Sequence, residues 1–320
     1  MRRRESMTTP DNGADIDVEL PSVASEGMVV ADAEPVPVAV ITELTATPVK
    51  KRRWALWLPA IWIAVVVVSA LAAPILPIDD PMKSDFGHVA TGPFTGGHLL
   101  GTDNIGRDIL SRLIWGSRVA LTVGVVAVAV GLVIGGALGL LAGYYRGKVE
   151  SVLMGVVDIM LAFPALVLVI AITAFLGQSL RNVAIAVAVV ATPAFARVAR
   201  AATLTFAQRE FVTAARGMGA TNRRILVREI LPNVILPLAA FALVVVAVAI
   251  VAEGGLAFLG LSVPAPKPSW GSMINDGRGK LEDAPFISLI PSAMMFVTVL
   301  AFNLIGDVFR GHFDVREGAI

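Results

Sequence analysis

The densest group of charged and small residues in this apolar chain is EFVTAARGMGATNRRILVREILPN, residues 210–233. Its arginines can pair with carboxylates, and its alanines and glycines allow another backbone to approach closely. The pattern predicts a helix that Gly219 ends in a left-handed conformation, a second helix capped by Thr221, and a further segment opened by Pro232. A basic hairpin of this kind either lies on lipid headgroups or docks into a protein partner, and the residues alone favour neither.

Residues suited to enzyme chemistry are sparse. The chain has no cysteine, which excludes disulfide and thiol chemistry. GYYRGK, residues 143–148, has too few residues between its glycines and lacks the hydroxyl residue of a phosphate-binding loop. His88, His98 and His312 have no ligand spacing, so we expect ordinary loop residues. The sequence therefore predicts no catalytic residue, no metal site and no cofactor in this chain, and nothing indicates nucleic-acid binding.

The elements that position the hairpin are apolar segments. Of the 320 residues 56% are hydrophobic and 16% charged, and the mean hydropathy is +0.77. A transmembrane helix needs roughly 20 mostly apolar residues, and continuous runs indicate helices and not barrel strands. We therefore predict an all-α membrane protein with six transmembrane helices and a polar hairpin between the fourth and the fifth. The expected spans are 54–78, 119–142, 152–176, 183–198, 231–252 and about 287–308, the fourth being the shortest.

The charge distribution predicts the orientation. If the N-terminus is inside and the chain crosses six times, most of the 26 Lys and Arg residues fall on the inner side, as the positive-inside rule requires. Both termini are then cytoplasmic in a multi-pass protein of the plasma membrane. The expected organisation is a disordered tail at 1–49, a first helix and external segment at 50–118, a core at 119–310 with the hairpin loop at 201–230, and a tail at 311–320.

Three features within the spans have predicted roles. Glycines recur every fourth residue from Gly131 to Gly143, which predicts close packing against another helix. Asp158 is expected to pair with a cytoplasmic arginine and not to contact a solute. For Glu253, a gating or partner contact and a structural role remain equally open.

Two segments are expected on the outer side of the membrane. Residues 79–117 contain Asp103 with Arg107 and Asp108 with Arg112, each four apart, which predicts weak charge pairs on a short interfacial helix. Residues 253–286 are rich in proline and glycine, which excludes a long helix.

The hairpin resembles the EAA loop of the permeases of ABC importers. Ala214, Ala215 and Gly219 match its alanines and glycine, and Pro232 follows Leu231 as in its Leu-Pro. Thr213 and Glu229 depart from the general Glu and Ile, as in the peptide-importer branch. Residues 100–118, 252–274 and 302–316 also resemble segments of permeases from dipeptide, oligopeptide and nickel importers, although Asp314-Val315 replaces their usual Asp-Pro. The resemblance covers about 54–316.

The resemblance implies a permease subunit of an ATP-driven importer that works by alternating access. The implied fold is that of a type I ABC importer permease, an all-α membrane protein with six transmembrane helices and a cytoplasmic coupling-helix hairpin. Di- or oligopeptides are the expected cargo, with nickel, glutathione or another small solute as the alternative. Implied partners are a second permease, ABC ATPase subunits that hold ATP and magnesium, and an extracytoplasmic solute-binding protein. Residues expected to couple to the ATPase are Ala214, Ala215, Arg216, Gly219, Arg223, Arg224 and Pro232. Those expected at the docking site of the binding protein are Asp103, Arg107, Asp108, Arg112 and Trp270.

Two other classes remain open. An ATP-independent secondary transporter would need its own coupling-ion site and usually shows repeated halves, which are not evident here. A membrane scaffold or sensor would not need the hairpin.

Overall fold

The computed structural model describes residues 54–317, so the predicted tail at 1–49 lies outside the described residues. The described chain is built from helices joined by irregular segments, as predicted. The element order is α2 (Trp54–Ala72), α3 (Ile109–Tyr145), α4 (Gly147–Ala162), α5 (Ala165–Leu176), α6 (Leu180–Phe206), α7 (Glu210–Gly217), α8 (Asn222–Arg224), the π-helix η1 (Ile225–Ile230), α9 (Leu231–Phe258), α10 (Trp270–Gly277), the 3₁₀ turn η2 (Arg278–Lys280) and α11 (Phe286–Glu317).

Four helices among the described residues are long and apolar enough to cross a membrane, and up to five if one bent pair counts as a span. The four are Ile109–Tyr145, Leu180–Phe206, Asn222–Phe258 and Phe286–Arg310. The prediction of six spans is therefore confirmed only as an all-helical membrane protein with four to five candidate spans. The first apolar helix, α2, is described over Trp54–Ala72 and is shorter than these four. Its Trp62 donates a hydrogen bond to Thr298 of α11 at 3.1 Å.

The third predicted span is broken. Helices α4 and α5 meet at an angle of 86°, and Phe163 and Pro164 between them are extended, with ψ of 134° and 126°. Proline lacks the N–H needed to continue the helix, and its ring disfavours helical backbone at the residue before it. The sequence prediction of one continuous helix over 152–176 was wrong at this point.

The glycine ladder of α3 packs against α6, as predicted. A Cβ at Gly135 would lie 2.2 Å from the carbonyl oxygen of Thr192, and one at Gly139 would lie 2.2 Å from that of Ala196. Side chains at these positions would push the two backbones apart. The long α3 and α6 therefore form the tightest contact in the helical core, and buried residues such as Phe195 and Ile250 fill the space toward α9.

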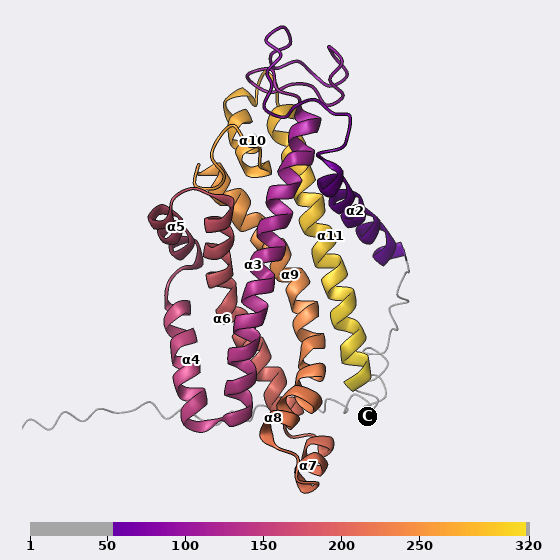
Figure 1. Cartoon of the computed structure of the whole chain (residues 1–320). Helices are drawn as coiled ribbons and strands as arrows, with labels where there is room; N and C mark the ends of the chain where they lie inside the picture. The colour runs from indigo at the N-terminus through magenta and orange to yellow at the C-terminus, as the bar shows by residue number, and fades with distance from the viewer. Residues whose placement is uncertain (1–53, 318–320) are drawn as a thin grey trace, which may run out of the picture. The chain divides into compact units, whose positions relative to one another are not determined.

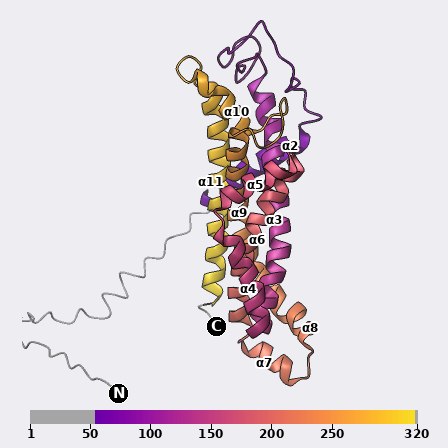
Figure 2. The same cartoon turned by 90° about the vertical axis from the view of Figure 1, so that its left-hand side faces the viewer.

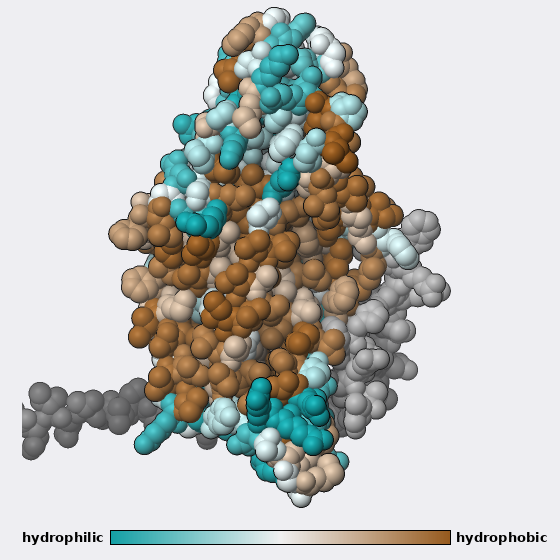
Figure 3. All heavy atoms as spheres, viewed as in Figure 1, coloured by the Kyte–Doolittle hydropathy of each residue, from teal (hydrophilic) through white to brown (hydrophobic). Residues whose placement is uncertain are grey.

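The polar segments gather at the two ends of the helices. Figures 1 and 2 show α10 and the 79–108 segment at one end, and α7 and α8 at the other. Between these ends, hydrophobic side chains cover most of the visible face in Figure 3, and hydrophilic ones gather at both ends. The apolar band is suited to a lipid bilayer, which places the hairpin and the external segments on opposite sides of it.

Candidate functional sites

The basic hairpin is built as its sequence predicts up to the second helix. Gly219 has φ of +80°, the left-handed conformation that ends α7. The Thr221 hydroxyl caps α8 by accepting from the N–H of Arg224 at 3.4 Å. The second helix then continues through η1 into α9 without a break, so Pro232 lies at the start of α9 and does not begin a separate element.

The hairpin buries one set of side chains, most of which join the hydrophobic core of the long helices, and exposes another. Ala215 is buried with Val212, Ile225, Leu226 and Ile230, whereas Ala214, Gly219 and Pro232 are exposed. Arg216, Arg223 and Arg224 are also exposed and, within the described part of the chain, form no ion pair. Met218, 83% exposed, lies beside them in the sequence. The exposed part of the hairpin thus carries these three cationic side chains and the large apolar side chain of Met218.

The hairpin is also attached to the helical core. The Tyr144 hydroxyl at the end of α3 donates a hydrogen bond to Asn222 Oδ1 at the start of α8, at 2.8 Å. Because α8 continues into α9, a displacement of the hairpin acts on two long helices. Sequence reasoning missed this contact, which joins residues 78 positions apart.

The five residues predicted for docking at the external end lie inside the protein. Asp103 and Arg107 do pair, at 2.6 Å, but on irregular backbone and not on an interfacial helix. Arg112 does not pair with Asp108; it lies 3.5 Å from Asp103 and 3.5 Å from Asp276. The helix begins only at Ile109, with Asp108 as its N-cap. Because Asp103, Arg107, Asp108 and Arg112 are buried, they form an internal framework of charged contacts beneath the external face.

Trp270 belongs to the same framework. It is fully buried, and its indole N–H donates to the carbonyl oxygen of Leu113 at 3.0 Å. Its ring also abuts Gly116, where a Cβ would lie 3.1 Å from the indole. Asp276, which sequence reasoning did not single out, lies near the opposite end of α10 from Trp270. Its carboxylate accepts a hydrogen bond from the Arg107 guanidinium at 3.2 Å. These contacts dock α10 on the beginning of α3.

The two external histidines lie together, which their spacing did not predict. The ring centroids of His88 and His98 are 6.1 Å apart, and Asp79, Asp85 and Asp108 surround them. Burial disfavours the charged form of His98, but the hydrogen bond and charge of Asp108, together with Asp85 and Asp79, outweigh it and raise the pKa of His98. The hydrogen bond with His88 lowers the pKa of Asp85.

Asp158 and Glu253, the two carboxylates whose roles the sequence left to be decided, both have partners. Asp158 of α4 pairs with Arg197 of α6 at 2.7 Å, which confirms the expected pairing with an arginine. Glu253 is 1% exposed and accepts a hydrogen bond from the Ser262 hydroxyl at 2.7 Å. This contact favours the structural role of Glu253 among the two alternatives.

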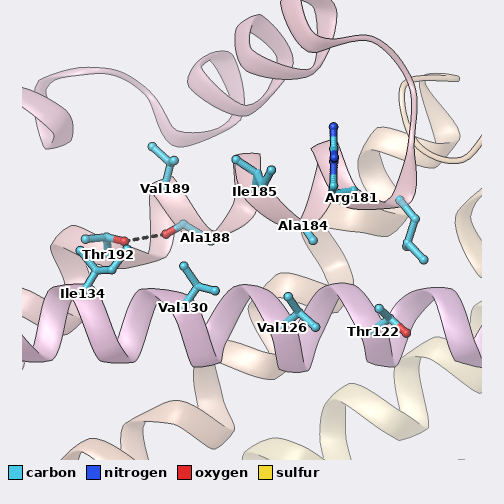
Figure 4. Close-up of a pocket in the computed structure, with 11 residues that line it drawn as sticks. Thr122, Val126, Val130, Ile134, Arg181, Ala184, Ile185, Ala188, Val189 and Thr192 are labelled. Carbon is cyan, nitrogen blue, oxygen red and sulfur yellow. Dashed lines mark hydrogen bonds between the residues drawn. The ribbon is translucent and has the colours of Figure 1, made fainter.

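An apolar groove of about 570 Å³ lies between α3 and α6. In Figure 4, Val126, Val130 and Ile134 rise from α3 toward α6, and Arg181 stands at one end of the row. The hydroxyl of Thr192 donates back to the carbonyl of Ala188 at 2.8 Å, so it is occupied within its own helix. The groove thus combines an apolar wall with one charged side chain.

Known proteins resemble this chain in sequence. Residues 135–317 match the family described as "Binding-protein-dependent transport system inner membrane component". The glutathione transport system permease protein GsiD of Pectobacterium atrosepticum is 39% identical over 254 residues, which cover 79% of this chain and 84% of that protein. The proteins of the same name from Escherichia coli O6:K15:H31 and Shigella boydii have the same identity and coverage.

Known structures resemble it in fold. One crystal form of the MetNI methionine ABC transporter in an inward-facing conformation matches with a TM-score of 0.55 and 21% identity, covering 63% of this chain and 97% of that chain. A second form matches with a TM-score of 0.53, covering 62% and 95%. At this identity the likeness shows the fold alone, and the fold is that of ABC-importer permeases.

Proposed function

The chain belongs to the family of binding-protein-dependent transport system inner membrane components, and from this premise we propose that it is a permease subunit through which an ATP-driven importer admits glutathione or a related short peptide. The observation that carries the proposal is the 39% identity to glutathione permeases over 79% of the chain. The family match makes the chain a multi-pass inner-membrane permease of an ABC importer. It is a transport subunit and not an enzyme, with no cofactor for the transport chemistry, and its system includes an ATPase and a binding protein.

The relatives shift the expected cargo. The sequence alone favoured di- or oligopeptides and kept glutathione and nickel as alternatives. The glutathione permeases among the relatives support glutathione over the general peptide interpretation. Glutathione is itself a tripeptide, so the two interpretations concern related chemistry. The family match also argues against the two other classes left open by the sequence, a secondary transporter and a membrane scaffold or sensor.

The proposed topology has six crossings with both termini in the cytoplasm. It counts α2 as a short first span and the bent α4 and α5 as the third. Support comes from the side on which the basic residues fall and from the placement of α7 and α8 opposite α10. In this topology the domain limits at 50–118, 119–310 and 311–320 remain as the sequence predicts, although α11 continues to Glu317.

The proposed coupling element is the hairpin of α7 and α8. The exposed Arg216, Arg223 and Arg224 suit carboxylates on an ATPase, and exposed Ala214 and Gly219 permit close approach. Buried Ala215 shapes the hairpin from within, and Pro232 marks the entry to α9. Movement of the ATPase would reach the core through α9 and through the contact between Tyr144 and Asn222.

At the opposite end, we assign the five buried external residues to positioning. Asp103, Arg107, Asp108, Arg112 and Trp270 hold the surface that the binding protein meets, without themselves being exposed to it. The groove between α3 and α6 is the face we assign to the second permease subunit, with the solute passing between the two subunits. Its support is the apolar lining with Arg181, a cation suited to the carboxylates of a peptide, at one end.

Uptake by cells tests the cargo. A strain lacking the gene for this chain, and the same strain complemented with it, are given radiolabelled glutathione, a labelled dipeptide or labelled Ni²⁺. We expect ATP-dependent glutathione uptake to be lost in the deletion strain and restored by the complementing copy, with Ni²⁺ uptake unchanged.

Two results would contradict glutathione as the cargo. Unchanged glutathione uptake with loss of dipeptide uptake would return the general peptide interpretation, and loss of Ni²⁺ uptake alone would make the chain a nickel permease.

Co-purification tests the assembly. A tagged chain purified in mild detergent should bring an ATPase and a second permease with it, as identified by mass spectrometry. A chain that purifies alone under conditions preserving a known ABC complex would argue against the assembly.

A further inference from the structure

Three carboxylates and two imidazoles converge in the external segment. Asp85 Oδ2 lies 2.8 Å from His88 Nδ1 and 3.7 Å from His98 Nε2. On the other side of the His98 ring, Asp108 Oδ2 lies 2.9 Å and Asp79 Oδ2 3.9 Å from Nδ1. Within the described residues, no Lys or Arg forms an ion pair with these three carboxylates. When both histidines are neutral, the cluster carries negative charge without a paired cation.

Asp108 fixes the orientation of the His98 ring. One oxygen of Asp108 caps α3 by accepting from the N–H of Ser111 at 2.7 Å, and the other lies at hydrogen-bond distance from His98 Nδ1. When Nδ1–H donates to this carboxylate, the lone pair of Nε2 faces Asp85 and His88. A carboxylate behind the imidazole is the usual second partner of a histidine that binds a metal through its other nitrogen. Because both Asp108 oxygens are engaged, Asp85, His88 and His98 are the better ligand set.

The backbone holds these three residues in place. The Asp85 N–H donates to the carbonyl of Gly106 at 2.8 Å, and the His88 carbonyl accepts from the Thr102 hydroxyl. The His98 carbonyl accepts from the N–H of Phe94 at 3.1 Å. Gly106 lies so close to Asp85 that a Cβ there would meet its carbonyl oxygen at 2.1 Å. The ligand atoms thus stand on a framework independent of any ion.

We propose that Asp85, His88 and His98 bind one Zn²⁺ ion at the external face, with water completing the coordination. One ligand atom from each residue lies within 4.8 Å of the other two. In a tetrahedral site with bonds of about 2.1 Å the ligands stand roughly 3.4 Å apart. The separation of 3.7 Å between Asp85 and His98 is close to this value, and the ion takes the place of the proton shared by Asp85 and His88.

The ligand set selects the class of ion. Two imidazoles and one carboxylate suit Zn²⁺, whereas Ca²⁺ and Mg²⁺ prefer oxygen ligands throughout. The ion joins the turn at 85–88 to His98, and through Asp108 to the beginning of α3. It is a structural ion of the external loop and not a cofactor of transport, and it does not depend on which solute is carried.

Zinc binding by the purified full-length chain tests the proposal. The chain carries a streptavidin-binding tag, because a polyhistidine tag would itself bind Zn²⁺, and is dialysed in detergent against Zn²⁺ with excess Mg²⁺ and Ca²⁺. Elemental analysis is expected to give about one Zn²⁺ per chain, and the ion should be lost in His88→Ala and in Asp85→Asn. His312→Ala, which removes the third histidine, is the matched control and should retain the ion.

Further variants separate the proposed ligand set from its neighbours. Asp108→Asn can still cap α3 and should weaken Zn²⁺ binding about 10–100-fold, as expected for loss of an orienting carboxylate. Asp79→Asn should leave binding unchanged. The half-exposed His88 can be replaced without opening the core, so monodisperse His88→Ala protein is expected. The proposal is overturned if unmodified chain and His88→Ala bind equal Zn²⁺, or if Asp79→Asn loses the ion while Asp85→Asn keeps it.

Discussion

Gly219 shows how one residue determines the geometry of the hairpin. Its φ of +80° is a conformation that costs other residues roughly 1–2 kcal/mol, most of all β-branched ones. No neighbouring atom lies within 4 Å of a Cβ built there, so the constraint is conformational and not steric. Gly217, two residues earlier, is helical, and no neighbouring atom lies within 4 Å of a Cβ built there either. A substitution at Gly217 therefore adds bulk without backbone strain and serves as the control.

We expect Gly219→Val to reduce co-purification of the ATPase severalfold, because the valine shifts the second arm of the hairpin away from its docking position. Gly217→Val adds the same side chain without the strain and should retain the ATPase. The measurement is the ratio of ATPase to tagged chain after purification in mild detergent. Equal ratios for both variants and the wild type would remove the coupling role from the turn at Gly219.

Arg107 and Lys280 contrast a buried ion pair with an exposed one at the external end. Arg107 bridges Asp103 at 2.6 Å and Asp276 at 3.2 Å and is 8% exposed, whereas Lys280 makes only an exposed contact of 4.0 Å. Removing one partner of a buried ion pair costs on the order of 3–5 kcal/mol, and an exposed pair contributes about 0–1 kcal/mol.

We therefore expect Arg107→Glu to lower both the thermal stability of the chain and its affinity for the binding protein. Lys280→Glu should change the melting temperature little. Thermal unfolding in detergent and a binding titration with the purified binding protein provide the two readouts. Unchanged affinity in Arg107→Glu would show that the binding protein does not depend on this framework.

At the scale of elements, the contact of α3 with α6 depends on which glycines face the partner. Gly135 lies against the backbone of α6, while the adjacent Gly136 faces Leu238, whose nearest atom would be 3.7 Å from an added Cβ. We expect Gly135→Ala to destabilise the chain by about 1–3 kcal/mol, because neither backbone can move easily in a packed core. Gly136→Ala should be nearly neutral.

The measurement is the midpoint of thermal unfolding in detergent for both alanine variants. A clear fall for Gly135→Ala alone supports the assigned packing face. If both variants unfold at the wild-type temperature, α3 and α6 are not in the close contact described.

For the whole molecule, the proposed topology places Lys267 outside and Met218 inside. Both side chains are exposed, and the chain has no cysteine of its own, so single cysteines report one site each. In intact cells we expect a membrane-impermeant thiol reagent to label Lys267→Cys and to reach Met218→Cys only after permeabilisation. Labelling of Met218→Cys in intact cells would invert the topology.

Local signals in the sequence determined the helical class, the glycine face of α3, the Gly219 turn and the Thr221 cap, because each depends on neighbours within a few residues. The family followed from ordered motifs along the chain. Tertiary structure alone decided the bend at Pro164, since a proline within an apolar run is compatible with either a kink or a break. It also decided the burial of Arg112 against Asp276, the joining of Tyr144 to Asn222, and the meeting of His88 with His98. These partners come together only when irregular external backbone folds onto the helix ends, and neither helical period nor residue spacing encodes that geometry.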